Sequence, residues 1–421
     1  MRFTSSFSRP ALFLALVLPA LMAVLQVAHS QAPAQTPLLN KSGGGVDPNV
    51  MLNIDDSGSM LFQHMPESSV VVGSFTVAHP IGSNSVRMHP SDNATLAAFF
   101  VGTIAAQQTS TNWRQKMLRS PDTNTIYYNP EIRYSPWAVS TFPLPAATAT
   151  NPAGRMANSP VAAAFRDPNS PVAGGVIDLT TVSASINDTW CFRNTSSGCN
   201  NNNAAFDPGL YYRLKKNASG QYLDPANEAN YDRYTINNIG AAAYSAYPVK
   251  SAARTDCAGA TCTQAEERQN FANWFSYYRT RNLMTRGALM EAFATVGNTF
   301  RVGFGRINKG TASVDGVNTK VIESNTATYG GGGVRAFDQT RKNQLFTWLR
   351  DLPANGGTPL PAALAAVGDY FKRTDAKGPW TDNPGQTGNT VANNKTCRRS
   401  YQIMATDGYW NGTPPTVGNV D

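Results

Sequence analysis

The chain has 421 residues, of which 41% are hydrophobic and only 15% are charged. That length suffices for one large domain or two medium ones, and the scarcity of charge beside abundant Gly, Pro, Asn, Ser and Thr is typical of a loop-rich exported protein. The net charge of +8 is spread along the chain without a Lys/Arg run interleaved with aromatic residues, which argues against nucleic-acid binding.

The amino-terminal stretch has the pattern of a secretory signal. Basic residues precede an apolar run from Ala11 to Leu25, and small residues suited to cleavage follow near Ser30. A membrane anchor is the alternative, but the run is short for a span and contains Pro19. We therefore expect a signal peptide over residues 1–30 and a Pro/Gly linker over residues 31–48.

A strand followed by a polar turn is predicted next. Apolar side chains alternate from Val50 to Ile54, and the pattern stops at Asp55. Asp55, Ser57 and Ser59 then place one carboxylate and two hydroxyls at alternate positions of a glycine-containing turn. Such hard oxygen ligands suit a small divalent cation such as Mg2+. A polar turn with a Ser cap is the alternative.

Residues 61–262 carry little helical periodicity and are rich in Asn, Pro, Ser and aromatic residues. Because the segment is too long for one structureless loop in a compact domain, we expect an insertion subdomain of short strands and loops.

The five cysteines favour structural disulfides in an exported chain. Cys191 with Cys199, and Cys257 with Cys262, are each close enough in sequence to close a small loop, and neither pair has the spacing of a zinc site. Cys397 is left over, which suggests a partner outside this chain.

Helical periodicity begins at Thr263, where Thr263 and Glu266 have the spacing of a capping box. Apolar and aromatic residues recur behind it and predict one long amphipathic helix, or two, over residues 265–296, with the aromatic stripe in the core. A strand follows over Phe300–Phe304, and Val314-Asp315-Gly316-Val317 predicts a hairpin turn leading to a second strand near Lys320–Ile322.

The last third continues the alternation of helices and strands. After a glycine-rich break at Gly330–Gly333, a helix is predicted around Leu345–Leu352. A second helix is predicted with Thr358 as its N-cap and Pro359 as its first residue, and a strand over Tyr401–Ala405 then leads to Asp407. This alternation predicts an α/β fold with a mainly parallel sheet, whose ligand sites lie at the carboxyl ends of the strands.

Three separate loops thus offer oxygen ligands in a fixed order: Asp55, Ser57 and Ser59, then Thr358, then Asp407. This set resembles the metal-ion-dependent adhesion site of von Willebrand factor A-type domains. The resemblance implies a doubly wound α/β sheet in which these residues hold a divalent cation, Mg2+ with Ca2+ or Mn2+ as alternatives, directly or through water. It also implies that an acidic side chain of a partner completes the cation's shell.

A narrower resemblance covers most of the chain. It rests on the stretch Asn270–Arg281, the Tyr-Asn-Pro motif at Tyr128, the loop Gly356–Leu360 and the segment Cys397–Gly412, which are similar to the type IV pilus tip-associated biogenesis proteins and adhesins of the PilY family. In that family a β-propeller with a calcium loop follows the A-type domain, whereas this chain ends at Asp421.

From this resemblance we expect an A-type domain, incomplete at its carboxyl end, over residues 49–60 and 263–421, interrupted by the insertion at 61–262. Cys397 would then pair with a residue of the missing portion.

The leading hypothesis is a non-enzymatic exported protein of type IV pilus biogenesis and tip-associated adhesion. Its expected partners are pilus tip or minor pilin proteins and a host or abiotic surface receptor, and its location is the cell surface, pilus tip or outer membrane. A generic secreted or surface A-type binding module unrelated to pili is the alternative. A hydrolase is disfavoured, because the sequence has four histidines and no His-Glu-x-x-His, Gly-x-Ser-x-Gly or phosphate-loop motif.

Overall fold

The structure, a computed structural model, describes residues 45–66, 69–78, 113–148, 150–169, 176–180, 209–237, 244–408 and 410–416. The chain divides into the units Met1–Gly45 and Val46–Asp421, and every described helix and strand belongs to the second unit. The predicted signal peptide, most of the linker and the Cys191/Cys199 pair lie outside the described residues. Within these ranges no helix has the length and apolar character that crossing a bilayer requires.

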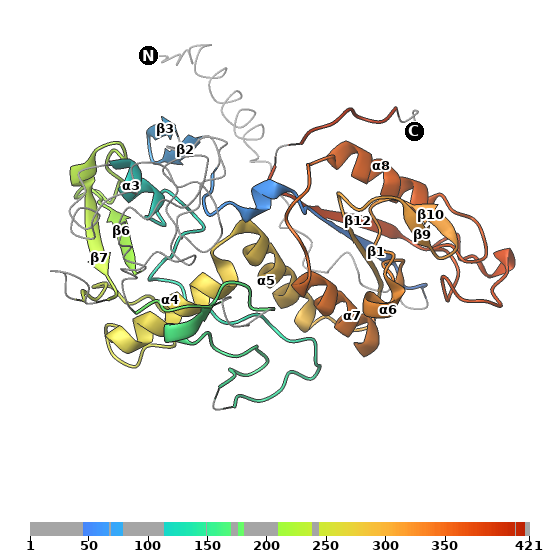
Figure 1. The fold of residues 1–421 in the computed structure, drawn as a ribbon, viewed down its shortest axis with the longest axis horizontal. Coiled ribbons are helices and arrows are strands. Elements are labelled where there is room, and N and C mark those ends of the chain that lie inside the picture. The colour runs from blue at the N-terminus through green and yellow to red at the C-terminus, as the bar shows by residue number, and fades with distance from the viewer. Residues whose placement is uncertain are drawn as a thin grey trace, which may run out of the picture. The chain divides into compact units, whose positions relative to one another are not determined.

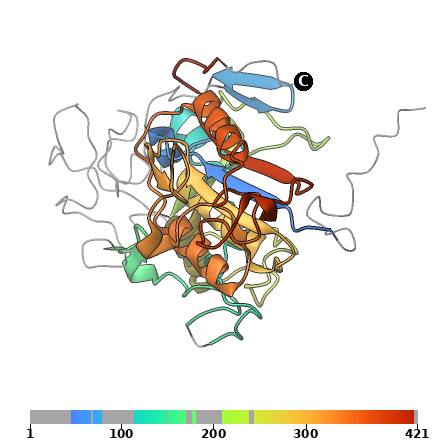
Figure 2. The same cartoon turned by 90° about the vertical axis from the view of Figure 1, so that its right-hand side faces the viewer.

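A four-stranded sheet with the order β11-β8-β1-β12 contains three of the predicted strands, as β1, β8 and β12. Strand β1 (Asn49–Ile54) pairs in parallel with β8 (Arg301–Arg306) on one side and with β12 (Ser400–Ala405) on the other. The short β11 (Arg335–Ala336) adds an antiparallel edge to β8. Figure 2 shows β1 and β12 running side by side. The predicted α/β class with a mainly parallel sheet is confirmed.

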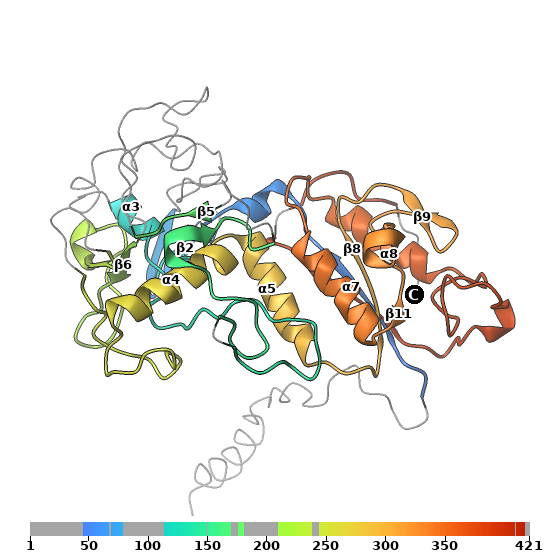
Figure 3. The same ribbon diagram turned by 60° about the horizontal axis from the view of Figure 1, so that its bottom comes forward.

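Helices cover both faces of this sheet, as Figure 1 and Figure 3 show for α7 (Gln339–Arg350) and α8 (Leu360–Phe371). Phe304 of β8 packs on Trp348 of α7 with ring centroids 5.0 Å apart. Met51 of β1, which points to the other face, lies in one buried cluster with Ala363 and Val367 of α8. Every residue of β1 is therefore buried, as expected for a central parallel strand.

The predicted helical stretch over 265–296 is two helices, α4 (Gln264–Tyr278) and α5 (Arg281–Ala294). The capping box at Thr263 and Glu266 is confirmed. The break falls at Thr280, whose side chain accepts a hydrogen bond from the backbone N–H of Leu283 and so starts the second helix.

The aromatic stripe of α4 is core, as predicted, but it packs on the preceding segment of the chain. Trp274 lies edge-on to Tyr127 with ring centroids 5.1 Å apart, and its indole N–H donates to the carbonyl of Ile126. Tyr128 and Tyr211 belong to the same buried cluster. Helix α4 thus anchors the aromatic core that follows β1 in sequence.

The described part of residues 61–262 consists of short elements joined by loops. Its antiparallel pairs are β2 with β3, β4 with β5, and β6 with β7. The elements of this part, with the preceding turn η1, are η1 (Gly58–Leu61), β2 (Ser69–Val72), β3 (Phe75–Ala78), α3 (Trp113–Leu118), η4 (Val161–Ala163), β4 (Ala164–Phe165), β5 (Val176–Ile177), β6 (Leu210–Leu214), η5 (Glu228–Asn230) and β7 (Tyr231–Thr235). The predicted disulfide between Cys257 and Cys262 is present, and Cys397 is exposed with no disulfide partner among the described residues.

One predicted strand is misplaced. The hairpin consists of β9 (Ala312–Val314) and β10 (Val317–Thr319), so its second strand starts directly after the turn rather than near Lys320–Ile322. Asp315 and Gly316 both have positive φ, as the tightest hairpin turns require. Val321 also has a positive φ, 60°, which breaks any strand through the predicted range.

Two elements complete the fold. Helix α6 (Thr326–Tyr329) ends at Gly330, whose φ of 66° makes it the left-handed cap and confirms the predicted break. The turn η6 (Val391–Asn393) precedes β12. Helix α7 ends at Arg350, so Leu352, the last residue of the predicted helix, is buried just beyond the observed one.

Candidate functional site

The three loops that carry the predicted ligands meet at the carboxyl end of the parallel strands. Asp55 directly follows β1, and the parallel register places Ile54 beside Ala405, two residues before Asp407. Ser57 forms a parallel bridge with Gly356, and the N–H of Gly58 donates to the carbonyl of Gly356 at 2.9 Å. The Gly-Gly-Thr loop therefore lies alongside the Asp-x-Ser-x-Ser turn.

Asp55 is a fully buried carboxylate held by neutral donors. The backbone N–H of Ser57 donates to its Oδ1 at 2.8 Å, and the hydroxyl of Thr406 donates to its Oδ2 at 2.8 Å. Burial raises the pKa of Asp55, with a smaller contribution from the charge of Asp407, although these hydrogen bonds oppose the rise. A buried anion in this state is stabilised by any cation that reaches it.

The two carboxylates beside Asp55 already have cations. Asp56 pairs with Arg306 at 2.7 Å and accepts hydrogen bonds from the backbone and side chain of Asn308. Asp407 pairs with Arg281 at 2.8 Å, and the side chains of that pair are each 4% exposed. Of the three carboxylates at this end of the sheet, Asp55 is the one that forms no ion pair among the described residues.

The serine hydroxyls lie next to each other. The Oγ atoms of Ser57 and Ser59 are 2.9 Å apart, and either can donate to the other. The Ser57 backbone is fixed by its bond to Asp55, so the first hydroxyl is placed directly after the buried carboxylate. Two adjacent oxygens of this kind are compatible with a shared cation.

Thr358 is buried but is not the N-cap that the sequence predicts. Pro359 occupies the cap position of α8 with φ −80° and ψ 56°, and no side chain caps the helix. Asn411 holds Thr358 outside the helix: its side-chain oxygen accepts from the Thr358 N–H at 3.0 Å, and its own N–H donates to the Thr358 carbonyl at 2.9 Å.

The residues at this end therefore fit a hard divalent cation in part. Asp55, Ser57, Ser59 and Thr358 would supply oxygen ligands, and the uncompensated charge of Asp55 would favour the cation. Asp407 reaches the same end of the sheet, but its carboxylate is paired with Arg281. No group of three His, Cys, Asp or Glu side chains suited to a metal occurs in the described ranges, so a cation here would depend on hydroxyls.

Sequence reasoning missed the supporting residues Arg281, Thr406 and Asn411. All three lie inside the motifs that carry the PilY resemblance. Nothing in their spacing assigns them to the site, because their partners are 126, 351 and 53 residues away in sequence, respectively.

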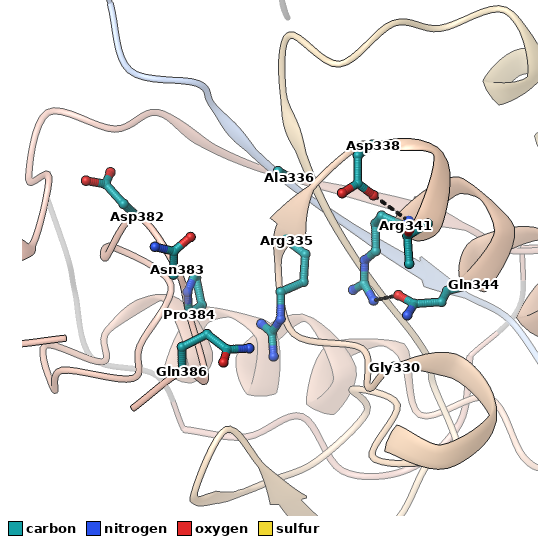
Figure 4. A pocket seen from close by; sticks show the side chains of 11 residues that line it. Gly330, Arg335, Ala336, Asp338, Arg341, Gln344, Asp382, Asn383, Pro384 and Gln386 are labelled. Carbon is teal, nitrogen blue, oxygen red and sulfur yellow. Dashed lines mark hydrogen bonds between the residues drawn. The ribbon is translucent and has the colours of Figure 1, made fainter. Parts of the chain in front are cut away.

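Two pockets of about 320 and 360 Å³ are not lined by any of the predicted ligands. One of about 320 Å³ is lined by Arg335, Arg341 and Gln386 among others (Figure 4). It lies beside β11, which pairs with the amino end of β8, opposite the end that carries Asp55. The guanidinium of Arg341 at its wall donates to three backbone carbonyls, which fits a structural role.

The fold and the converging loops define a class: a mixed α/β protein with oxygen-bearing side chains gathered at the carboxyl end of parallel strands. Over 408 residues, 96% of its length, the chain is 27% identical to the type IV pilus biogenesis factor PilY1 of Pseudomonas aeruginosa strain PAO1. It is 27% identical to the PilY1 of strain UCBPP-PA14 over 90% of its length, and 34% identical to that of strain PAK over 37%. These similarities confirm the predicted resemblance to the PilY family.

The chain spans about a quarter of the length of the first two relatives, 27% and 24%. No protein-family model and no solved structure matches it. The assignment to von Willebrand factor A-type domains therefore stays a prediction, as does the metal site.

Proposed function

We propose that the chain acts in type IV pilus biogenesis as an exported, surface-associated protein that contacts pilus tip or minor pilin proteins. The supporting observation is its similarity to proteins named as type IV pilus biogenesis factors over 96% and 90% of its length. The proposed role is non-enzymatic. Deletion of the gene should reduce surface pili and twitching, and normal values of both would favour a generic A-type binding module instead.

The finer proposal is metal-dependent adhesion by an A-type domain over residues 49–60 and 263–421, with residues 61–262 as its insertion. Asp55, Ser57, Ser59 and Thr358 would hold a divalent cation, Mg2+ first among the candidates. When bound, the cation supplies a coordination position for a carboxylate of the partner. With few anionic protein ligands the cation keeps a strong demand for that carboxylate.

The surrounding residues orient the ligands. Thr406 and the backbone of Ser57 fix the two oxygens of Asp55, and Asn411 fixes Thr358. These contacts join the loops after β1 and β12 to the loop before α8, so the loops that carry the proposed ligands are held close to regular elements.

An exposed aromatic residue adjoins this arrangement. Trp410 is 53% exposed and directly precedes Asn411, which is bonded to Thr358. Tryptophan is enriched among the residues that contribute most of the binding energy at protein interfaces. The proposed partner surface therefore combines an acidic group for the cation with an apolar group for Trp410.

Complementation of the deletion strain separates the two proposals. We expect wild type to restore pili and surface attachment, and Asp55→Asn to restore pili without Mg2+-dependent attachment. Asp369→Asn is the matched control, because Asp369 is exposed on α8 and, within the described ranges, its ion pair is a local one with Lys372. Wild-type attachment by Asp55→Asn would contradict the adhesion proposal and leave the pilus role intact.

A further inference from the structure

Arg281 is a buried cation at the candidate metal site. It is the first residue of α5, and its Nη1 donates to Asp407 Oδ2 at 2.8 Å, with both side chains 4% exposed. The attraction within an ion pair this well shielded from water is screened less than in a surface pair, and removal of one partner of such a pair is strongly destabilising. Asp407 is one of the predicted metal ligands, but its carboxylate is already bound by Arg281.

The guanidinium is fixed from its other side as well. Its Nε and Nη2 donate to the carbonyl of His64 at 3.0 and 2.9 Å, and the backbone N–H of Arg281 donates to the carbonyl of Phe62. The guanidinium carbon also lies 5.0 Å from the centre of the Phe62 ring. These contacts tie Arg281 to the segment after the Asp-x-Ser-x-Ser turn, so it cannot swing away from Asp407 without breaking them.

Charge at the site follows from this arrangement. Asp55 and Asp407 are close enough to interact electrostatically. Arg281 neutralises Asp407, so a cation held by Asp55 meets one uncompensated carboxylate rather than two. Affinity for a divalent cation rises with the number of anionic ligands.

We propose, on the basis of the proposed cation site, that Arg281 is a positioning residue which keeps Asp407 out of the cation's shell and lowers the cation affinity of the site. The cation is then left with one protein carboxylate and a stronger demand for the carboxylate of a partner. Arg281 thus sets how far cation binding depends on that partner.

A second arginine provides a matched control. Arg306 pairs with Asp56 at 2.7 Å at the same end of the sheet. Asp56 is also bonded to Asn308 and is not among the predicted ligands. Loss of Arg306 removes the same charge from the same neighbourhood without releasing Asp407.

The test is a calorimetric titration of the full chain with Mg2+ alone, which measures the dissociation constant. We expect Arg281→Gln to bind Mg2+ roughly tenfold more tightly than wild type. A change of this size lies in the middle of the range of coupling energies between residues in contact. Arg281→Lys should stay near wild type, and Arg306→Gln should change the affinity less than Arg281→Gln does. A purely structural role for Arg281 predicts the opposite sign, because a disordered site binds more weakly.

Arg281→Gln leaves Asp407 buried and unpaired, which destabilises the fold. A second variant therefore tests the inference without this unpaired charge. The double variant Arg281→Gln/Asp407→Asn removes both charges and should bind Mg2+ about as wild type does. If the double variant instead loses affinity as severely as Asp55→Asn, Asp407 is a ligand in its own right and the inference is wrong.

The outcomes also separate this inference from the proposed function. Absence of Mg2+ binding by wild type, or binding that Asp55→Asn leaves unchanged, would overturn the cation site and the inference with it. Binding that Asp55→Asn abolishes, together with no tightening in Arg281→Gln, would overturn only the inference.

Discussion

Two buried carboxylates, Glu267 in the aromatic core and Asp55 at the end of the sheet, show how differently the molecule treats charge. Burial raises the pKa of both. Glu267 pairs with Arg254 at 2.9 Å and accepts a hydrogen bond from the hydroxyl of Tyr128 at 2.6 Å. Asp55 has hydrogen bonds from neutral donors only among the described residues. A bound cation could therefore neutralise the charge of Asp55.

This difference assigns different roles to the two regions. In the aromatic core, a buried charge with its own cation joins α4 to the preceding segment and contributes to a single packed arrangement. At the sheet end, an uncompensated charge lies beside hydroxyl oxygens at a position where open α/β sheets bind ligands. The first region should respond to mutation through stability, and the second through binding.

The largest effect is expected from Trp274→Ala. Trp274 is 1% exposed, and its loss removes a large buried side chain together with its hydrogen bond to Ile126. We expect the free energy of unfolding to fall by about 4 kcal/mol, as for other buried tryptophans. Urea unfolding measures this, and a loss below about 1 kcal/mol would mean that the aromatic core does not support the fold.

Arg254→Met should cost about 3 kcal/mol at neutral pH, because it leaves Glu267 buried without its cation. Arg254 lowers the pKa of Glu267, so its removal raises that pKa further above the ordinary value of 4.5. A raised carboxyl pKa contributes stability at low pH that is lost as the pH rises through it. Unfolding under mildly acidic and under neutral conditions should therefore show the variant recovering toward wild type at the lower pH; a deficit that grows on acidification would contradict the pairing.

Asp55→Asn should have a smaller effect, visible only with a cation. At Mg2+ concentrations about ten times the dissociation constant, wild type should gain about 1.4 kcal/mol of stability. The variant should gain none, while its stability without Mg2+ stays at or above the wild-type value, because a buried charge has been removed. Thermal unfolding with and without Mg2+ provides the measurement. Equal stabilisation of both proteins would exclude Asp55 as a ligand.

Many of the strands and helices could be predicted from the sequence, because the signals that specify them are local. The alternation at Val50–Ile54 and the capping box at Thr263 each act within a few residues, and both are confirmed. The position of the second hairpin strand is not predictable, because Val321 has a positive φ although valine strongly favours extended backbone. The cap of α8 was misassigned because Asn411, distant in sequence, holds Thr358 away from the helix.

The site is predictable only in part for the same reason. The candidate ligand residues can be selected by their order along the chain, whereas the ion pair of Asp407 with Arg281 cannot be predicted in this way. Whether a carboxylate is open or already neutralised depends on which basic side chain the fold brings to it. Arg281 reaches Asp407 from 126 residues away because α5 begins beside the end of β12.

The smallest effect on stability is expected from Trp410→Ala. With 53% of its surface exposed, Trp410 contributes little to the core, so the free energy of unfolding should change by less than about 0.5 kcal/mol. The gain of stability with Mg2+ should also stay at the wild-type value, since the side chain is not a ligand. Surface attachment should fall nonetheless, because a large apolar contact beside the proposed cation site is lost. Val391→Ala, which truncates an exposed apolar residue that is 59% exposed, is the control and should leave attachment unchanged. Attachment lost equally in both variants would point to a general surface effect, whereas loss in Trp410→Ala alone would extend the binding surface at the sheet end beyond its proposed metal ligands.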